Sequence, residues 1–195
     1  MNEIETRNFI KDSLIESSKI KQKIIEECTD DIEKAIDILV DSFKKGKKLL
    51  LAGNGGSAAD CQHIATEFVI RFSADFKRPS IPAIAITTDC SNITAGSNDI
   101  GFENTFARSI EGLGNEGDIF WAISTSGNSE NLIIAIKMAK DKKMKVITLL
   151  GSGGGKMKEM GDVSIVVPAT VTARIQEGHI TIAHIICHVV ERRLY

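Results

Sequence analysis

Apolar residues recur at three- and four-residue steps through the first 46 positions, which is the spacing of one face of an α-helix. The run Thr29-Asp30-Asp31 offers a break and an N-cap, with acidic side chains suited to the positive end of a helix. The pattern therefore predicts two helices, the second ending near Gly46. Their apolar positions are Ile4, Ile10, Leu14, Ile15, Ile20, Ile24 and Ile25 in the first, and Ile32, Ala35, Ile36, Leu39, Val40 and Phe43 in the second. Such a stripe suits packing between subunits and packing on the chain's own core equally well.

From Lys47 onward, short apolar runs alternate with amphipathic stretches. The runs predict strands over 48–52, 83–86, 118–123, 145–150 and 163–167, and they are compact, as in strands buried on both faces. The intervening stretches predict helices over 57–72, 101–113 and 129–142, and a final long helix over 172–193. This alternation predicts an α/β fold with a doubly wound, mostly parallel sheet of about five strands. We expect residues 1–46 to be a helical segment of the same domain, used in oligomer packing, and residues 47–195 to form the α/β domain.

Composition and charge exclude several classes of protein. The chain has 195 residues and a net charge of -2, which suits one globular domain and gives no electrostatic case for nucleic-acid binding. The first 11 residues alternate charged and apolar positions, so we expect no secretory signal, and no apolar run has the length of a membrane span. Four scattered cysteines without a C-x-x-C pair are expected to be reduced. These features predict a cytoplasmic protein.

A glycine-rich loop follows the first predicted strand. It reads Gly-Asn-Gly-Gly-Ser over residues 53–57, and its glycines allow backbone N–H groups to approach an anion closely at the start of the next helix. A plain strand-to-helix turn is the alternative. A dinucleotide site is another, because the spacing fits G-x-G-x-x-G/A. The strand pattern lacks an acidic residue about 20 positions later, so we expect no nucleotide cofactor.

A second loop is rich in hydroxyl groups and follows the third predicted strand. Residues 124–129 read Ser-Thr-Ser-Gly-Asn-Ser, with four hydroxyl side chains in six positions directly before a helix. Hydroxyls and helix N–H groups together make a neutral phosphate cradle, and four hydroxyls exceed what capping of one helix requires. The glycine-rich segment 151–156 does not fit G-x-x-x-x-G-K-[ST], so it is interpreted as a flexible turn.

Side chains able to bind a metal gather on two predicted helices. His63 and Glu67 stand four residues apart, which places both on one helical face. Gln176 and His184 stand two turns apart on the final helix, which also carries His188. Histidine and carboxylate ligands suit zinc or a similar divalent ion. The alternatives are a surface His–Glu pair and histidines with only structural roles.

Together these segments carry a resemblance to a known family. Residues 53–63 (GNGGSAADCQH), 124–131 (STSGNSEN) and 176–191 (QEGHITIAHIICHVVE) resemble the phosphoheptose isomerases of the sugar isomerase (SIS) family, and the likeness extends over essentially the whole chain. The resemblance implies reversible conversion of sedoheptulose 7-phosphate to D-glycero-D-manno-heptose 7-phosphate. That reaction opens the synthesis of ADP- or GDP-heptose precursors for lipopolysaccharide, capsule or other surface glycans. It also implies a homotetramer with sites at subunit interfaces, and one zinc ion per subunit.

The same resemblance implies residue roles by position. Glu67 and His184 match the acid/base pair, and a zinc site is matched by His63, Glu67, Gln176 and His184. The phosphate cradle is matched by Ser124, Thr125, Ser126 and Ser129. Other substrate contacts are matched by Asn54, Gly55, Gly56, Ser57, Asn98 and Asp99, together with Glu67 and Gln176. Gly178 departs from the expected pattern, because a bulkier residue is expected there inside a helix.

Proteins of another class share this fold. SIS domains also serve as non-catalytic sugar-phosphate sensors in regulators and as a DnaA-binding factor, since a fold does not determine a function. A sensor needs the serine cradle but not Glu67 and His184, so their joint presence favours an enzyme. Among enzymes, an isomerase of another sugar phosphate, such as arabinose 5-phosphate, is the main alternative.

Overall fold

Five parallel strands form the central layer of the computed structural model, which describes residues 1–195. They lie in the order β2-β1-β3-β4-β5, and every neighbouring pair is parallel. Their bounds are Leu49–Gly53 (β1), Ala83–Ala85 (β2), Ile119–Ser124 (β3), Lys145–Leu150 (β4) and Val163–Val166 (β5). The predicted doubly wound sheet is confirmed, and each strand ends within one residue of its predicted bounds.

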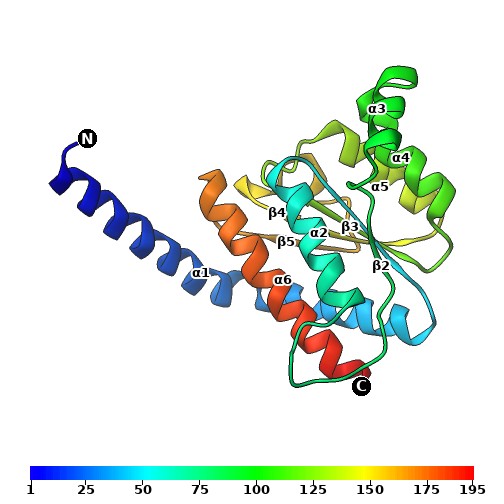
Figure 1. Ribbon diagram of the computed structural model, residues 1–195, viewed down its shortest axis with the longest axis horizontal. Coiled ribbons are helices and arrows are strands. Elements are labelled where there is room, and N and C mark those ends of the chain that lie inside the picture. The colour runs from blue at the N-terminus through cyan, green and yellow to red at the C-terminus, as the bar shows by residue number, and fades with distance from the viewer.

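Helices cover both faces of this sheet (Figure 1). They are α1 (Glu3–Lys44), α2 (Gly56–Val69), α3 (Cys90–Asp99), α4 (Phe102–Leu113), α5 (Glu130–Asp141) and α6 (Thr172–Leu194), with a short 3-10 turn, η1 (Ser152–Met157). Alternate strand residues point to opposite faces of the sheet and belong to two hydrophobic cores. Leu49 and Leu51 pack with α1, α2 and α6, while Leu50 packs with α4 and α5. None of the helices is long and apolar enough to cross a membrane.

The N-terminal segment is a single helix of 42 residues, so the prediction of two helices with a break at Thr29-Asp30-Asp31 was wrong. The Thr29 hydroxyl donates to the carbonyl of Ile25 within the helix at 2.6 Å instead of capping a new one. Asp31 faces solvent and pairs with Lys34 one turn on. No glycine or proline occurs before Gly46, so nothing interrupts the backbone hydrogen bonds.

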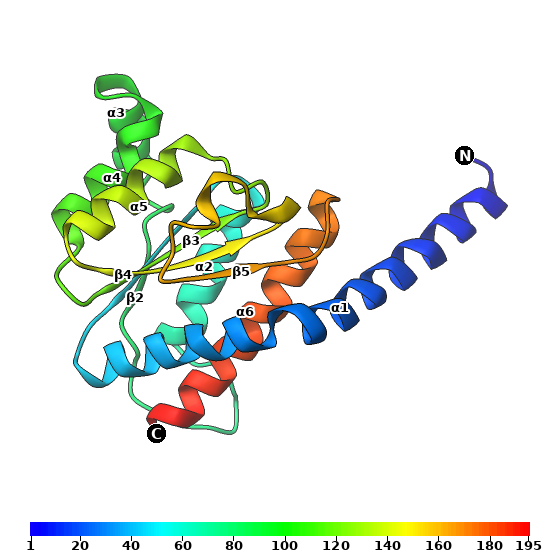
Figure 2. The same cartoon turned by 180° about the vertical axis from the view of Figure 1, so that it is seen from behind.

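The two halves of α1 differ in environment. From Ile20 onward its apolar residues, with the exception of exposed Ile25, pack into the core beside α6, whereas the first half projects beyond the body of the chain (Figures 1 and 2). Five large apolar side chains on the projecting half are more than half exposed: Ile4, Phe9, Ile10, Leu14 and Ile15. The projecting half therefore presents an apolar face that has no partner within the chain.

The final helix lies close to α1 and to the end of β5, and Gly178 explains this approach. A Cβ at Gly178 would lie 2.9 Å from Val167 Cγ1 and 3.2 Å from Ile24 Cδ1. The unexpected glycine therefore removes a side chain where three elements meet. Close packing here outweighs the roughly 1 kcal/mol that glycine costs inside a helix relative to alanine.

The strand order places two loops side by side. The chain passes from β1 to β2 on one side and then returns to β3 on the other side of β1. The carboxyl ends of β1 and β3 are therefore neighbours, and the loops that follow them flank the switch point of the sheet. Ligands of open α/β sheets bind in the crevice at such a point.

Candidate active site

The loop between β3 and α5 is shaped by its own hydroxyl groups. Ser124 Oγ accepts a hydrogen bond from the Gly127 N–H at 3.1 Å and lies 3.2 Å from Ser129 Oγ. Ser126 Oγ accepts from the Asn128 N–H at 3.2 Å. Ser129 is the N-cap residue of α5, yet its side chain caps no N–H group. The first N–H groups of α5 thus have no side-chain partner and stay available to an anion.

Both predicted loops line one small polar cavity of about 60 Å³. The β1–α2 loop contributes Asn54 and the start of α2 contributes Ser57, while the second loop supplies the four hydroxyl residues predicted as the cradle. The lining residues are Asn54, Ser57, Ile123, Ser124, Thr125, Ser126 and Ser129. Helix α2 also begins without a side-chain cap, because its N-cap is Gly55, with φ of 55°. Two uncapped helix N-termini therefore meet beside a cavity that no cation lines.

One residue that the sequence analysis missed joins the two loops. The amides of Asn54 and Asn131 exchange two hydrogen bonds, of 3.0 and 2.8 Å. Asn131 is buried in the first turn of α5. A reciprocal pair of this kind fixes the orientation of the Asn54 amide and leaves one donor and one acceptor site of that amide for a ligand.

The glycine-rich turn η1 supports the cradle loop from behind. The Met157 N–H donates to the Gly127 carbonyl at 3.0 Å, and the Lys156 N–H donates to Asn128 Oδ1 at 3.1 Å. Gly127, with φ of 64°, lies so close that a Cβ there would overlap the Gly154 carbonyl. The segment interpreted from sequence as a flexible turn is thus hydrogen-bonded to the cradle at two points.

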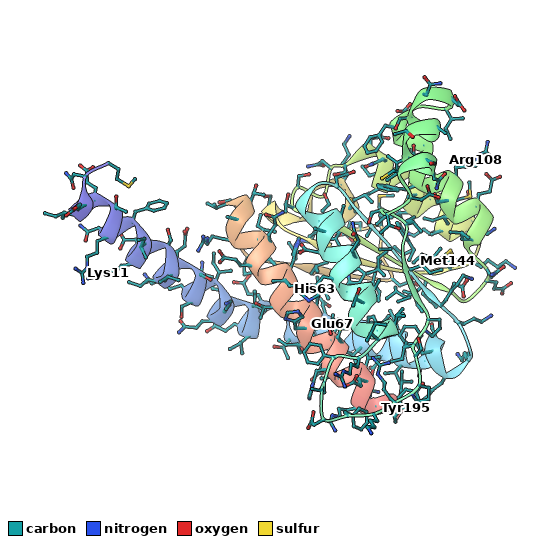
Figure 3. All side chains as sticks on the ribbon, in the orientation of Figure 1. Lys11, His63, Glu67, Arg108, Met144 and Tyr195 are labelled. Atoms are coloured by element: carbon teal, nitrogen blue, oxygen red, sulfur yellow. The ribbon has the colours of Figure 1, made fainter.

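Three metal-capable side chains meet where α2 and α6 lie side by side. His63 Nε2 lies 3.1 Å from Glu67 Oε1 and 3.3 Å from His184 Nε2. One donor atom of each residue lies within 4.8 Å of the other two. Figure 3 labels His63 and Glu67 on α2, beside α6. Two imidazole nitrogens and a carboxylate oxygen at this spacing match the donor types and ligand number that zinc takes in catalytic sites.

Other candidates on α2 and α6 lie outside this cluster. The Gln176 amide packs against Gly56 at the start of α2, where a Cβ would overlap Gln176 Nε2, and it makes no hydrogen bond to the three residues. His188 is exposed, with Nδ1 3.5 Å from Ser73 Oγ. Asp60 has a buried, unpartnered Oδ2 one turn before His63, and burial raises the pKa of its carboxyl. The sequence analysis gave Asp60 no role, although it lies within the first motif.

Two predicted substrate contacts lie apart from the rest. Asn98 and Asp99 end helix α3, both are exposed, and their side chains are hydrogen-bonded to each other at 2.7 Å. No hydrogen bond or ion pair joins them to the loops or to the His–Glu–His cluster within the chain. Helix α3 contains no buried residue and projects from the sheet (Figures 1 and 2).

Comparison with known proteins gives concordant matches. The SIS domain model matches residues 14–151. A phosphoheptose isomerase of Sulfurimonas denitrificans is 49% identical over 191 residues, which is 97% of each chain. Phosphoheptose isomerase 2 of Campylobacter jejuni is 49% identical over 190 residues, covering 96% of this chain and 94% of the relative.

Solved structures of the same group have the same fold. The phosphoheptose isomerase of Neisseria gonorrhoeae has a TM-score of 0.89 at 37% identity, covering 96% of this chain and 99% of the other. That of Francisella tularensis has a TM-score of 0.90 at 36% identity, covering 98% and 100%. The predicted resemblance is therefore confirmed, and the chain belongs to the phosphoheptose isomerases of the SIS domain family.

Proposed function

We propose that the chain interconverts sedoheptulose 7-phosphate and D-glycero-D-manno-heptose 7-phosphate through an enediol intermediate. The relatives named phosphoheptose isomerase, similar along their full length, support an isomerase of this kind. The observation that carries the proposal is the meeting of His63 and Glu67 on α2, a helix that begins beside a hydroxyl-lined cavity, with His184 on α6. A sugar-phosphate sensor or a DnaA-binding protein has no need of such a cluster.

The cluster fits a divalent metal, and zinc suits its donors best. His63, Glu67 and His184 would hold it, and Gln176 would add an oxygen from two turns earlier on α6. When bound, the metal acts as a Lewis acid that polarises the carbonyl oxygen of the open-chain sugar. Glu67 and His184 each retain a second atom, Oε2 and Nδ1, that makes no hydrogen bond within the chain. One atom of each residue can thus bind a metal while the other handles a proton.

The reaction needs two kinds of proton movement. One proton leaves C1 of the ketose and returns at C2 of the aldose, and a carboxylate such as Glu67 can carry it. A second proton moves from the oxygen on C1 to the oxygen on C2, and the imidazole of His184 suits that task, since imidazole can both accept and donate a proton. Each proton that the enzyme takes from C1 or from its oxygen is returned to C2 or to its oxygen, so Glu67 and His184 end in their starting protonation states. Asp99 would orient a sugar hydroxyl or assist ring opening.

The phosphate group would sit in the cradle of Ser124, Thr125, Ser126 and Ser129. The helix N-terminus of α5 and its free N–H groups favour an anion there without any lysine or arginine. Binding of this remote group holds the sugar chain in register, and that binding energy supports the chemical step. Asn54, Gly55, Gly56 and Ser57 would contact the sugar from the first loop.

We place the active assembly in a homotetramer in the cytoplasm, where the product feeds lipopolysaccharide, capsule or another glycan. The exposed apolar half of α1 supports subunit packing, and contacts by a neighbouring subunit would give Asn98 and Asp99 access to a site they do not reach within one chain. Replacement of Leu14 by Glu should yield smaller assemblies in sedimentation analysis. The matched change Leu113→Glu, at an exposed apolar residue on α4, should leave the assembly intact. Identical sedimentation of both variants and wild type would contradict packing through α1.

The roles on α6 are tested with a pair of histidine variants. His184→Ala should lose bound zinc and isomerase activity, whereas His188→Ala, one turn further along the same helix and outside the cluster, should keep both. Metal content is measured on purified protein, and activity as aldose formed from sedoheptulose 7-phosphate. Equal zinc content and activity in His184→Ala and wild type would remove His184 from the proposal.

A further inference from the structure

Arg78 and Glu191 form the one ion pair of the chain in which both side chains are buried. The Arg78 Nε lies 2.8 Å from Glu191 Oε2, and each side chain is 1% exposed. Arg78 lies in the segment between α2 and β2, and Glu191 lies near the end of α6. A buried pair of this type adds little net stability, because removal of two charges from water offsets their attraction. Its directional contacts suggest another role.

The guanidinium of Arg78 completes the end of the helix that carries Glu67. Its Nη2 donates to the Glu67 carbonyl at 2.7 Å, and its Nη1 donates to the Phe68 carbonyl at 2.8 Å. These carbonyls belong to the last turn of α2 and have no partner inside the helix. Nη1 also donates to the Pro79 carbonyl at 2.9 Å. Arg78 thus ties the turn of Glu67 to α6 through Glu191.

The carboxylate of Glu191 is also linked to His184, through Phe72. Its Oε2 also accepts from the Phe72 N–H at 3.2 Å, while its Oε1 is buried without a partner. The Phe72 ring lies 5.6 Å from the His184 ring, between centroids. Burial alone would raise the pKa of Glu191, but hydrogen bonds from Arg78 and Phe72 and the charge of Arg78 outweigh it and lower the pKa. Glu191 is therefore a carboxylate with partners on two sides.

From these contacts we infer that Arg78 and Glu191 are positioning residues that hold α2 against α6 so that His63, Glu67 and His184 face one another. The inference rests on the proposed role of these three residues as a metal site. Arg78 contacts the backbone of Glu67. Glu191 accepts a hydrogen bond from Phe72, whose ring packs near that of His184. Lysine cannot replace Arg78 in this role, because a single ammonium cannot present the planar fork that spans three carbonyls and a carboxylate.

The variant Arg78→Lys tests the inference with the charge kept. We expect the zinc affinity of the full-length protein, measured by competition with a chelating dye, to fall by about 10- to 100-fold, which is typical when a residue that orients ligands is lost. Glu191→Gln keeps a similar shape and should give a smaller fall in the same direction. The matched control is Arg193→Lys, since Arg193 joins α6 to Asp37 of α1 at 2.6 Å through exposed side chains. Its zinc affinity should equal that of wild type.

A core variant on the opposite face of the sheet distinguishes loss of positioning from a general loosening of the fold. Ile136 of α5 packs in the core between the sheet and helices α4 and α5, so Ile136→Val should leave zinc affinity unchanged. An affinity loss in Ile136→Val as large as that in Arg78→Lys would overturn the positioning role, and so would wild-type affinity in Arg78→Lys.

A readout without metal separates this inference from the metal proposal. In metal-free protein, the ring resonances of His184 should shift in Arg78→Lys but not in Arg193→Lys, because Phe72 packs on that ring. Failure of wild type to bind zinc would refute the metal site alone. Unchanged His184 resonances in Arg78→Lys would refute the positioning role in either case.

Discussion

Acidification should destabilise the chain through His179, a fully buried residue of α6 that lies outside the proposed chemistry. Its Nε2 lies 3.0 Å from the Leu150 carbonyl, so Nε2 carries the proton of the neutral ring, and the buried Nδ1 has no partner. Protonation of Nδ1 would place a positive charge in the core and create a buried N–H group that has no hydrogen-bond acceptor. Burial accordingly lowers the pKa of His179 to about 4, although the hydrogen bond to Leu150 acts in the opposite direction.

The pKa of this group is lower in the folded chain than in the unfolded one, where it is near 6.5. Between these two values the unfolded chain binds more protons, so stability is fully present above about pH 6.5 and is lost as the pH falls toward 4. A gap of about 2.5 pH units at about 1.4 kcal/mol each limits the loss to about 3 kcal/mol. About 2 kcal/mol of it should appear between pH 7 and pH 5.

Urea unfolding of wild type and His179→Gln at pH 7 and pH 5 measures this loss. Protein concentration must be kept constant, because assembly changes apparent stability. All other titrating groups are shared, so the wild type should lose about 2 kcal/mol more than the variant between the two pH values. His179→Phe, which is also uncharged, should behave like His179→Gln. Equal losses in wild type and both variants would refute the reasoning.

Three glycine positions give further predictions. Gly127→Ala should lower the free energy of unfolding by about 2–3 kcal/mol, since φ of 64° disfavours a side chain and the Cβ would overlap the backbone of Gly154. Gly112→Ala, in open space on α4, should raise it by about 0.5 kcal/mol, and equal urea midpoints for these two variants would contradict the account. Gly56→Ala should leave stability unchanged or slightly higher, because the group it displaces is the mobile end of Gln176, yet it should weaken zinc binding in a chelator competition. Wild-type zinc affinity in that variant would exclude the amide from the metal site.

The sheet could be predicted from sequence because its signals are local. The central strands β1, β3 and β4 are compact apolar runs with both faces buried, so their ends coincide with the change in composition. Helix α3 gave no such signal, because none of its ten residues is buried and it therefore has no apolar face. Its start is marked only by the N-cap Asp89, whose Oδ1 accepts a hydrogen bond from the Asn92 N–H. Thr29 looked like a cap, but in a chain without a helix breaker its hydroxyl bonds to the preceding turn.

The site could be predicted only as separate pieces. The step from His63 to Glu67 indicates a shared helical face, but His184 joins them across 121 residues through the packing of α2 on α6. Asn131 had a signal that was missed, since it stands one helical turn before buried Ala135 on an apolar face. Arg78 lies in an irregular segment without periodicity, so its contacts appear only in three dimensions.

The central claim is tested most directly by incubating the purified, zinc-loaded chain with sedoheptulose 7-phosphate and following the anomeric proton signals of the aldose by NMR. The account predicts that wild type forms D-glycero-D-manno-heptose 7-phosphate to equilibrium, while Glu67→Gln, folded and at the same concentration, forms it at least about 100-fold more slowly, as expected for loss of a group that transfers a proton. Absence of aldose with folded, zinc-loaded wild type would contradict the proposed reaction, and equal rates for the two proteins would contradict the role of Glu67.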